Sequence, residues 1–381
     1  MKKEFDFFFV LPFLHPFPIG GYKIIYTIAD KLVQEGKVVG ILYIRNPKKI
    51  LKNFVKSTLY KRYKEEFGFK YDLFILFFNN NFGRRFLLPL TQRFLGIRFK
   101  YVFSGEVQVC FKNEIPEDYN IKYLIATGWE TSILVNQYNL TKNKYYLIQN
   151  FEDETLFSGS LSAIARKTYD FPLRKIVINE ELMKRFAKDS PRKIDIGIDS
   201  TTFKLTKSIE SRDKGRILLP MRKGKFKGMD YAKEIIKKIS FERPDIAIST
   251  FGEIYSEGSS QAVKQHGIIS NEDLLSLYND AAIFVLPSIY EGIPATAIEA
   301  MTCGCAVVSN DNIGIREVIN NHSNGVITSN GDIDLLCKAV YSLVDNPSTR
   351  IEIAHVGFNT AMKYSYKSLY ESFKLVISEN L

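Results

Sequence analysis

Two glutamates, Glu291 and Glu299, have a spacing that suggests chemistry. They lie in the stretch YEGIPATAIEAMTCGCAVVSND (290–311), and the seven residues between them carry no charge. The apolar run AAIFVLP (281–287) precedes them and is typical of a buried strand. Carboxylates accept hydrogen bonds from sugar hydroxyls, so two of them near the end of a strand suggest a site for a polyhydroxylated ligand. Taken alone, such a pair more often belongs to a solvated loop and a solvated helix face.

A helix start between the two glutamates suggests what else the ligand carries. We expect Pro294 to be the first helical residue, because its missing N–H would lack a partner there. Glu291 would then lie at the rim of the site, and Glu299 deeper, in the second helical turn. A helix start attracts phosphate through its dipole and its unpaired donors, here the N–H groups of Gly292, Ile293, Ala295 and Thr296. Sugar, ribose and diphosphate together describe a nucleotide sugar.

The basic loop RKGKFKG (222–228) supplies candidate cations for the diphosphate. It lies between an expected strand, RILLP (216–220), and an expected helix (229–239). Arg222 and Lys227 are the candidates, since a cation near a departing diphosphate stabilises its growing charge. The alternative is a solvated basic turn, and we expect the other lysines of this loop to be solvated.

Strands and helices alternate along the chain, which predicts two Rossmann-like α/β domains with parallel sheets. Glycines 20 and 21 in PIGG (18–21) are expected to form a tight turn that lets the loop approach the donor; an ordinary turn is the alternative. Expected helices are at 22–36, 229–239, 270–281 and from Pro294 onward. Expected strands are at 5–13, 38–44, 71–78, 121–127, 145–150, 175–179, 216–220, 246–252, 281–287 and 305–310.

The stretch IDIGIDSTTF (194–203) is where we place the domain junction. The expected domains are an acceptor-side domain (1–200) and a nucleotide-sugar domain (201–360). The expected C-terminal helix (361–381) would pack back on the first domain. Two such domains put their strand ends across a cleft, where ligands of parallel sheets bind.

The composition indicates an ordinary globular protein of 381 residues, 45% hydrophobic and 25% charged. No apolar run approaches the roughly 20 residues of a membrane span. The apolar start resembles a signal peptide, but Glu4 and Asp6 interrupt it, and a buried strand is the better interpretation. Four cysteines without a CxxC pair, and four scattered histidines, argue against a zinc site or a disulfide framework. We therefore expect a cytoplasmic protein.

Charge is spread unevenly. Residues 45–100 hold fourteen Lys or Arg and three Asp or Glu, whereas residues 251–381 hold seven and fifteen. Residues 48–70 place apolar side chains four apart with lysines around them. This pattern fits either a helix packed on the first domain or a surface resting on an anionic membrane. No nucleic-acid motif accompanies the basic charge, so we expect no nucleic-acid partner.

The second half resembles the E-x7-E motif of retaining glycosyltransferases of family 4, which have the GT-B fold. The resemblance runs through residues 266–319. It also includes the junction at 194–203 and the "GR…KG" spacing of Arg222 and Lys227. It implies that Glu299 holds the ribose hydroxyls, that Glu291 contacts the donor sugar, and that the glycine of ISTFGE, Gly252, lines the donor site. The implied catalytic residues are Glu291, Arg222 and Lys227.

The first half resembles a bacterial rhamnosyltransferase-like subgroup that uses a dTDP-sugar. The similar stretches are 126–135, 146–157 and 165–172. Two positions depart from the family pattern. Pro294 stands where many relatives have glycine, and Gln149-Asn150 stands where many have a histidine near the donor sugar, so no histidine is assigned that role.

The resemblance implies transfer of a hexose or deoxyhexose, rhamnose among them, to a lipid-linked bacterial surface glycan such as an O-antigen or capsule. The alternatives are a GT-B sugar-nucleotide epimerase, which needs no acceptor, and a non-catalytic paralogue. Asp332-Ile-Asp334 is a formal DxD metal motif, but its place before LLCKAV favours Asp332 as a helix N-cap. We therefore expect no metal and no cofactor. Glu130 and Glu152 either face the acceptor or are solvated.

Overall fold

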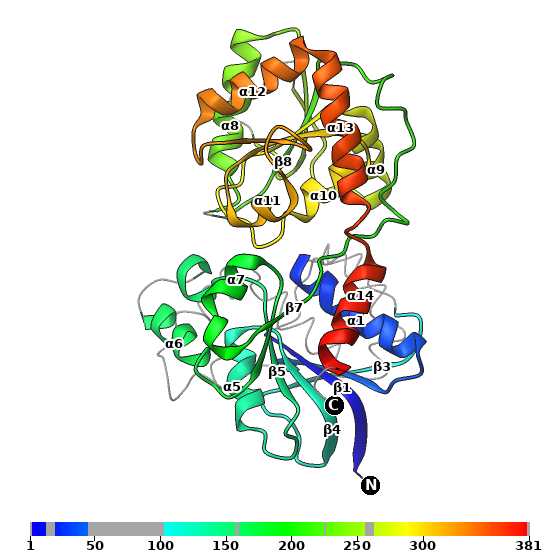
Figure 1. The fold of residues 1–381 in the computed structure, drawn as a ribbon, viewed down its shortest axis with the longest axis vertical. Helices are drawn as coiled ribbons and strands as arrows, with labels where there is room; N and C mark the ends of the chain where they lie inside the picture. The colour runs from blue at the N-terminus through cyan, green and yellow to red at the C-terminus, as the bar shows by residue number, and fades with distance from the viewer. Residues whose placement is uncertain are drawn as a thin grey trace. The chain divides into compact units, whose positions relative to one another are not determined.

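The computed structural model describes residues 2–12, 20–44, 103–156, 160–224, 226–255 and 263–378. The expected strand at 71–78 and the basic stretch at 48–70 lie outside these residues. The chain divides into two compact units. Unit 1 comprises Met1–Ile178, Leu182–Ile194 and Ser372–Leu381, and unit 2 comprises Asn179–Glu181 and Asp195–Glu371. Each is a parallel sheet with helices packed against it (Figure 1).

Unit 1 contains a parallel sheet in the order β3-β2-β1-β4-β5-β6-β7. The aromatic residues of the first strand are buried because helices cover both faces of such a sheet. Its helices include α1 (Gly20–Gln34), α5 (Trp129–Gln137) and α6 (Ser160–Thr168). A π-helical turn, η2 (Glu152–Leu156), follows the fifth strand, and η3 (Ala187–Asp189) precedes the seventh. The strands are β1 (Lys3–Leu11), β2 (Val39–Ile44), β3 (Val107–Lys112), β4 (Tyr119–Ala126), β5 (Lys144–Ile148), β6 (Arg174–Val177) and β7 (Arg192–Lys193).

Unit 2 contains a second parallel sheet in the order β10-β9-β8-β11-β12-β13. A separate hydrophobic cluster lies on each face of this sheet. The strands are β8 (Arg216–Met221), β9 (Ala247–Gly252), β10 (Val263–Gln265), β11 (Ile283–Leu286), β12 (Ala306–Asn310) and β13 (Val326–Thr328). The helices are α8 (Met229–Glu242), α9 (Asn271–Asp280), α10 (Ala295–Thr302), α11 (Ile313–Val318), α12 (Ile333–Asp345) and α13 (Pro347–Ala361); α7 (Glu180–Arg185) begins in unit 2 and ends in unit 1.

The prediction of a tight turn at 18–21 is wrong for residues 20 and 21. Gly20 and Gly21 do not form a tight turn but the first residues of α1, two residues before the expected helix start. A Cβ on Gly21 would lie 2.7 Å from Oε1 of Gln149, so this glycine gives the Gln149 side chain room beside the helix. Residues 18 and 19 of the expected turn lie outside the described part of the chain.

The expected C-terminal helix starts later than predicted. Ala361 ends α13, and the last described helix, α14, runs over Tyr366–Ser378. The Phe373 ring lies 6.1 Å from that of Phe7 and 6.4 Å from that of Phe9, so the end of α14 packs within unit 1.

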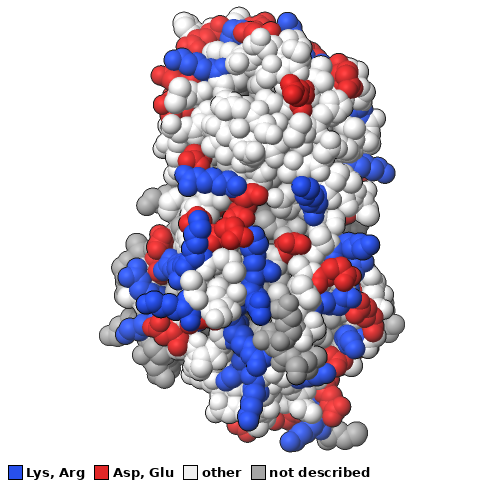
Figure 2. All heavy atoms as spheres, viewed as in Figure 1, with Lys and Arg blue, Asp and Glu red and all other residues white. Residues whose placement is uncertain are grey.

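Figure 2, drawn in the same view as Figure 1, shows Lys and Arg side chains gathered over the visible face of unit 1. None of the helices that can be described has both the length and the apolar character needed to cross a membrane.

Candidate functional site

Two loops of unit 2 meet at the carboxyl edge of its sheet. One follows β8 and carries Arg222 and Lys227; the other follows β11 and carries Ser288 and Glu291. Because β8 and β11 are paired and parallel, their carboxyl ends lie side by side. Residues more than sixty positions apart in the sequence therefore come together.

Glu291 is the centre of this cluster. Its Oε1 accepts a hydrogen bond from Nη2 of Arg222 at 2.6 Å, and its Oε2 accepts one from Nζ of Lys227 at 2.6 Å. The Glu291 side chain is 4% exposed, whereas those of Arg222 and Lys227 are 28% and 39% exposed. The two cations therefore face solvent while the carboxylate lies beneath them.

The burial of Glu291 corrects the expectation that it lies at the rim of the site. Burial alone opposes ionisation of Glu291, but the charges of Arg222 and Lys227 outweigh it and hold its pKa below the ordinary value. A buried carboxylate is stable only when paired and hydrogen-bonded, and both cations meet that need.

Ser288 holds the two loops together. Its hydroxyl accepts a hydrogen bond from Nη2 of Arg222 at 2.9 Å and donates one to the carbonyl of Lys227 at 3.2 Å. The N–H of Gly314 donates to the carbonyl of Glu291 at 2.9 Å, which attaches the same loop to α11. These bonds fix the backbone that carries the three charged residues.

Two glycines allow the loops to approach this closely. Gly228, at φ 76°, precedes α8, and a Cβ there would lie 2.2 Å from the carbonyl oxygen of Pro287. Gly252, at φ 106°, ends β9, and a Cβ there would lie 2.2 Å from the carbonyl oxygen of Met221. Glycine is the residue that both adopts positive φ and leaves such space. Gly252 therefore lies beside the last residue of β8, directly before Arg222.

The helix after Glu291 starts one residue later than expected. Ala295 is the first residue of α10, and Pro294 occupies the N-cap position without a side-chain capping bond. Within the described residues, no hydrogen bond is donated by the N–H groups of Gly292, Ile293, Ala295 and Thr296.

Two further donors beside this helix start also lack a partner. The Thr296 hydroxyl is buried and forms no hydrogen bond in the described part of the protein, and the same holds for Nε of Arg222. The expected group of unpaired donors is therefore present, and a side-chain hydroxyl and a guanidinium N–H join it. Such a group can bind an anion with several oxygens.

Glu299 lies in the second turn of α10 and is 6% exposed, so it is not on a solvated helix face. Its Oε2 accepts a hydrogen bond from the Tyr278 hydroxyl at 3.3 Å. Burial, and then the charge of Glu299, raise the pKa of Tyr278 well above its ordinary value, so the hydroxyl stays a donor. The tyrosine fixes one oxygen of a carboxylate that sequence reasoning assigned to a ribose.

Unit 1 contains a second pair of buried carboxyl groups. Glu130 is the second residue of α5 and Glu152 is the first residue of η2, and they are 5% and 9% exposed. A Cβ on Gly128 would lie 3.4 Å from Oε2 of Glu130 and 3.5 Å from Oε1 of Glu152, so both carboxyl groups point at the same place. The solvated alternative is therefore wrong for both residues.

The protonation of this pair follows from its surroundings. Burial raises the pKa of Glu130 to about 7. Burial, and then the charge of Glu130, raise the pKa of Glu152 to about 8, although the Tyr146 hydroxyl donates to Glu152 at 2.6 Å. No pattern in the sequence marks these glutamates as buried, because their neighbours in space come from separate elements.

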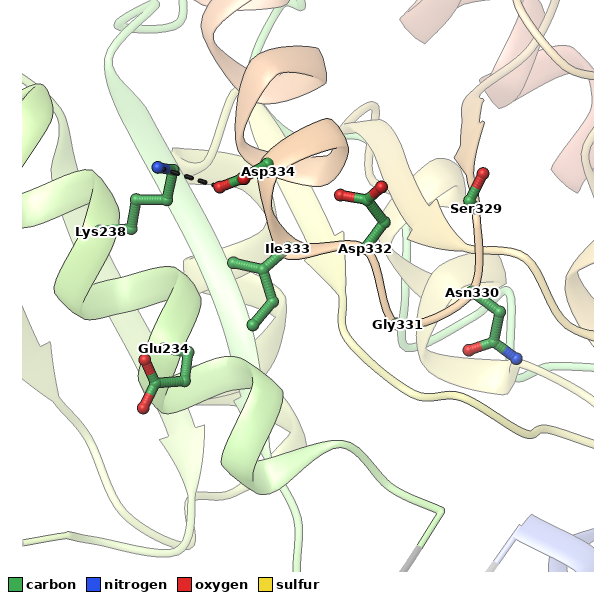
Figure 3. A pocket seen from close by; sticks show the side chains of 8 residues that line it. All are labelled: Glu234, Lys238, Ser329, Asn330, Gly331, Asp332, Ile333 and Asp334. Atoms are coloured by element: carbon green, nitrogen blue, oxygen red, sulfur yellow. Dashed lines mark ion pairs between the residues drawn. The ribbon is translucent and has the colours of Figure 1, made fainter.

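The DxD motif has a structural explanation. The Asp332 carboxylate accepts a hydrogen bond from the N–H of Leu335 at 2.9 Å, so the N-cap interpretation is confirmed. Asp334 instead forms an ion pair with Lys238 of α8 at 3.0 Å. Figure 3 shows both residues lining a surface hollow of unit 2, with Asp334 turned toward Lys238. The two carboxylates thus serve different partners.

Lys223, another lysine of the basic loop, is not part of the cluster. Lys223 is 75% exposed and pairs with Glu253 at 2.7 Å. Lys225 lies outside the described residues.

A known protein family matches the part of the chain that contains this site. Residues 204–358 match the family described as "Glycosyl transferases group 1". We call residues 204–358, which are similar to glycosyl transferases of group 1, the group 1 domain. The domain holds the whole cluster of Arg222, Lys227, Glu291 and Glu299.

The chain is also similar to curated proteins that are named as glycosyltransferases. An uncharacterized glycosyltransferase of Haemophilus influenzae is 22% identical over 161 residues, 40% of this chain and 46% of that protein. N,N'-diacetylbacillosaminyl-diphospho-undecaprenol alpha-1,3-N-acetylgalactosaminyltransferase of Campylobacter jejuni is 30% identical over 99 residues, 26% of each chain. Poly(glycerol-phosphate) alpha-glucosyltransferase of Bacillus subtilis is 23% identical over 269 residues, 68% of this chain and 35% of that protein. The chain spans less than half the length of each of these relatives.

Solved structures show the fold. HepE of Anabaena in complex with UDP and glucose matches at a TM-score of 0.67 and 13% identity, covering 98% of this chain and 100% of that one. Sucrose-phosphate synthase from Thermosynechococcus elongatus matches at 0.67 and 12% identity, covering 99% of each chain. The expected GT-B fold is confirmed, with the group 1 domain as its second half.

Proposed function

We propose that the protein is a retaining glycosyltransferase that moves a hexose or deoxyhexose from a nucleotide-diphosphate sugar to a growing bacterial surface glycan. One observation carries the proposal: two cations, four unpaired backbone N–H groups and two buried carboxylates gather at one edge of the group 1 domain. Those are the groups that a diphosphate and two sets of sugar hydroxyls require.

The diphosphate would bind Arg222, Lys227 and the N–H groups at the start of α10. As the bond to the sugar breaks, negative charge grows on the diphosphate, and the two cations stabilise that charge where it develops. Departure and acceptor attack on the same face of the sugar would retain its anomeric configuration. No divalent metal is required in this proposal, because the two cations and the helix start would stabilise the negative charge of the diphosphate.

The remaining residues would position the donor. Glu299, held by Tyr278, would accept hydrogen bonds from the ribose hydroxyls, and Glu291 would contact the donor sugar. Gly252 would line the donor site beside the loop after β8, and Gly20 and Gly21 would present the start of α1 to the donor.

The names of the relatives suggest which donors and acceptors to test first. These relatives are named as a diphospho-undecaprenol N-acetylgalactosaminyltransferase, an O-antigen chain mannosyltransferase and a poly(glycerol-phosphate) glucosyltransferase. HepE binds UDP and UDP-glucose. We therefore propose a lipid-linked glycan as the acceptor, and UDP- and dTDP-sugars, dTDP-rhamnose included, as the first donors to test.

A lipid-linked acceptor places the protein at the inner face of the cytoplasmic membrane as a peripheral protein. The basic stretch at 48–70, outside the described residues, would contact anionic lipid. Co-sedimentation with liposomes tests this: binding should need anionic lipid and weaken as salt rises, and equal binding to neutral liposomes would contradict it.

The donor is identified by a thermal-shift panel of nucleoside diphosphates and nucleotide sugars, because a ligand of the native state raises its stability. The stabilising nucleotide sugar is then incubated with and without bacterial lipid-linked glycan. Release of nucleoside diphosphate that depends on the acceptor supports the transferase. Conversion of the free nucleotide sugar without an acceptor would instead identify an epimerase, and no stabilisation by any nucleotide would leave a non-catalytic protein.

A further inference from the structure

Glu291 uses both of its oxygens on the two cations that a diphosphate would need. The bonds from Arg222 and Lys227 are 2.6 Å each, and the carboxylate lies beneath the cations with a side-chain exposure of 4%. The most direct donors of the site are therefore already paired with an anion of the protein itself.

A diphosphate and this carboxylate are alternative partners for the same N–H groups. Both are anions, so a diphosphate beside Arg222 and Lys227 would also be repelled by Glu291 at short range in a partly buried site. A charge-assisted hydrogen bond is strong, so breaking two of them reduces the net gain from binding. Full engagement of the diphosphate by both cations thus requires Glu291 to release them.

We propose that Glu291 is an internal competitor of the diphosphate, which neutralises Arg222 and Lys227 when no nucleotide is bound and is displaced by it. This inference rests on the proposed function and adds a regulation of the same site. Displacement frees the Glu291 carboxylate to contact the donor sugar. After transfer, its return to the cations speeds departure of the nucleoside diphosphate.

The opposite role would be that Glu291 only orients the cations for the diphosphate. The two roles differ in the sign of one result. If Glu291 orients the cations, its removal weakens diphosphate binding; if it competes, its removal strengthens binding. A purely structural role cannot produce a gain in affinity.

The test is calorimetric titration of the full-length chain with UDP and with inorganic diphosphate, which carries no base or sugar. Glu291→Gln keeps the size of the side chain and removes its charge. We expect it to bind both ligands about tenfold or more tightly than the wild type and to release UDP more slowly. The matched control Glu291→Asp keeps the charge and should stay within about threefold of the wild type.

A second background keeps the test decisive if Glu291→Gln alone folds poorly. In the Lys227→Gln background, replacing Glu291 leaves only one cation, Arg222, without its anionic partner. Adding Glu291→Gln to this background should still tighten binding of inorganic diphosphate through Arg222. Unchanged or weaker binding on loss of the Glu291 charge, in a background in which the variant is folded, would overturn the inference.

Failure of the inference and failure of the proposed function are distinguishable. Lys227→Gln and Arg222→Gln alone should weaken binding of UDP and of inorganic diphosphate. If they do so while Glu291→Gln does not tighten binding, only the competitor role falls. If neither cation matters for either ligand, the proposed function falls with it.

Discussion

At the scale of single residues, the site depends on charges that compensate one another. Glu291 remains an anion inside the group 1 domain because Arg222 and Lys227 contact its two oxygens. The same compensation holds two cations together at 28% and 39% exposure, where a second anion can reach them. In the role proposed above for Glu291, this cluster binds a second anion by exchange of partners.

Replacing either cation by methionine should remove most of the activity. We expect Arg222→Met and Lys227→Met each to lower kcat/KM by about 10²-fold or more, because a preorganised cation at a developing charge contributes on that scale. Lys223→Met is the control, since Lys223 is 75% exposed and pairs with Glu253. Steady-state kinetics with circular dichroism of each variant checks this, and full activity in both cation variants would refute the assignment.

The buried pair in unit 1 should make stability depend on pH. Both carboxyl groups have a folded-state pKa raised from 4.5, to about 7 for Glu130 and about 8 for Glu152. The folded state therefore holds protons that the unfolded state loses. Their contribution is fully present below about pH 4.5 and is lost as pH rises to about 8.

Replacing both glutamates by glutamine should flatten this dependence. Between pH 5 and pH 8, the free energy of unfolding of the wild type should fall, relative to that of the Glu130→Gln, Glu152→Gln variant, by on the order of 6 kcal/mol. Glu117→Gln, at an exposed position, is the control. Denaturant titrations across this range provide the measurement, and identical pH profiles of the variant and the wild type would contradict the assignment.

At the scale of elements, the site is made by loops that pack more closely than a side chain would allow. Gly228 holds the loop after β8 against the carbonyl of Pro287 after β11, and Ser288 links the two loops by hydrogen bonds. The start of α10 adds unpaired N–H groups beside the charges. The strand ends, the loops and the helix start thus hold the charged residues together in one cluster.

Gly228→Ala should therefore disturb both stability and binding. Its Cβ would lie 2.2 Å from a backbone oxygen, in addition to the strain of a positive φ. Gly36→Ala is the matched control, because Gly36 has φ 77° but open space around its Cβ position. We expect about 1 kcal/mol of destabilisation in the control and clearly more in Gly228→Ala. Thermal denaturation and UDP titration check this, and equal effects in the two variants would show that the close approach is unimportant.

Local patterns were predictable from the sequence, and contacts between distant segments were not. Asp332 caps α12 as expected, because capping depends on residues a few positions away. The start of α10 was predicted to within one residue. The burial of Glu291 was missed, because it depends on cations more than sixty residues earlier in the chain.

Short elements and buried acids were also beyond sequence reasoning. The strands β7, β10 and β13 have two or three residues each, too few for a periodic pattern to indicate. Glu130 and Glu152 follow strands that were predicted, but their burial depends on how the loops after β4 and β5 fold over one another.

At the scale of the whole molecule, the residues that we propose to bind the donor belong to one unit. Arg222, Lys227, Glu291 and Glu299 all lie in unit 2, and the group 1 family match covers the same residues. Unit 1 contains a different feature, the pair of buried carboxyl groups of Glu130 and Glu152.

Transfer by the whole protein should not depend on a divalent metal. Activity should survive excess EDTA, because the proposed anion site uses cations of the protein. Asp332→Asn should be mild, since asparagine caps helices as well as aspartate, whereas Asp332→Ala should cost about 1 kcal/mol of stability. Loss of activity in EDTA that Mn²⁺ or Mg²⁺ restores would overturn the metal-free mechanism.

The most direct test of the central claim is the anomeric configuration of the product. The purified chain is incubated with its stabilising nucleotide sugar and a lipid-linked glycan, and the new linkage is examined by NMR, with Arg222→Met as the inactive control. We predict one sugar transferred per nucleoside diphosphate released, with the configuration of the donor retained. An inverted linkage, or consumption of the nucleotide sugar without any transfer to the glycan, would contradict the account.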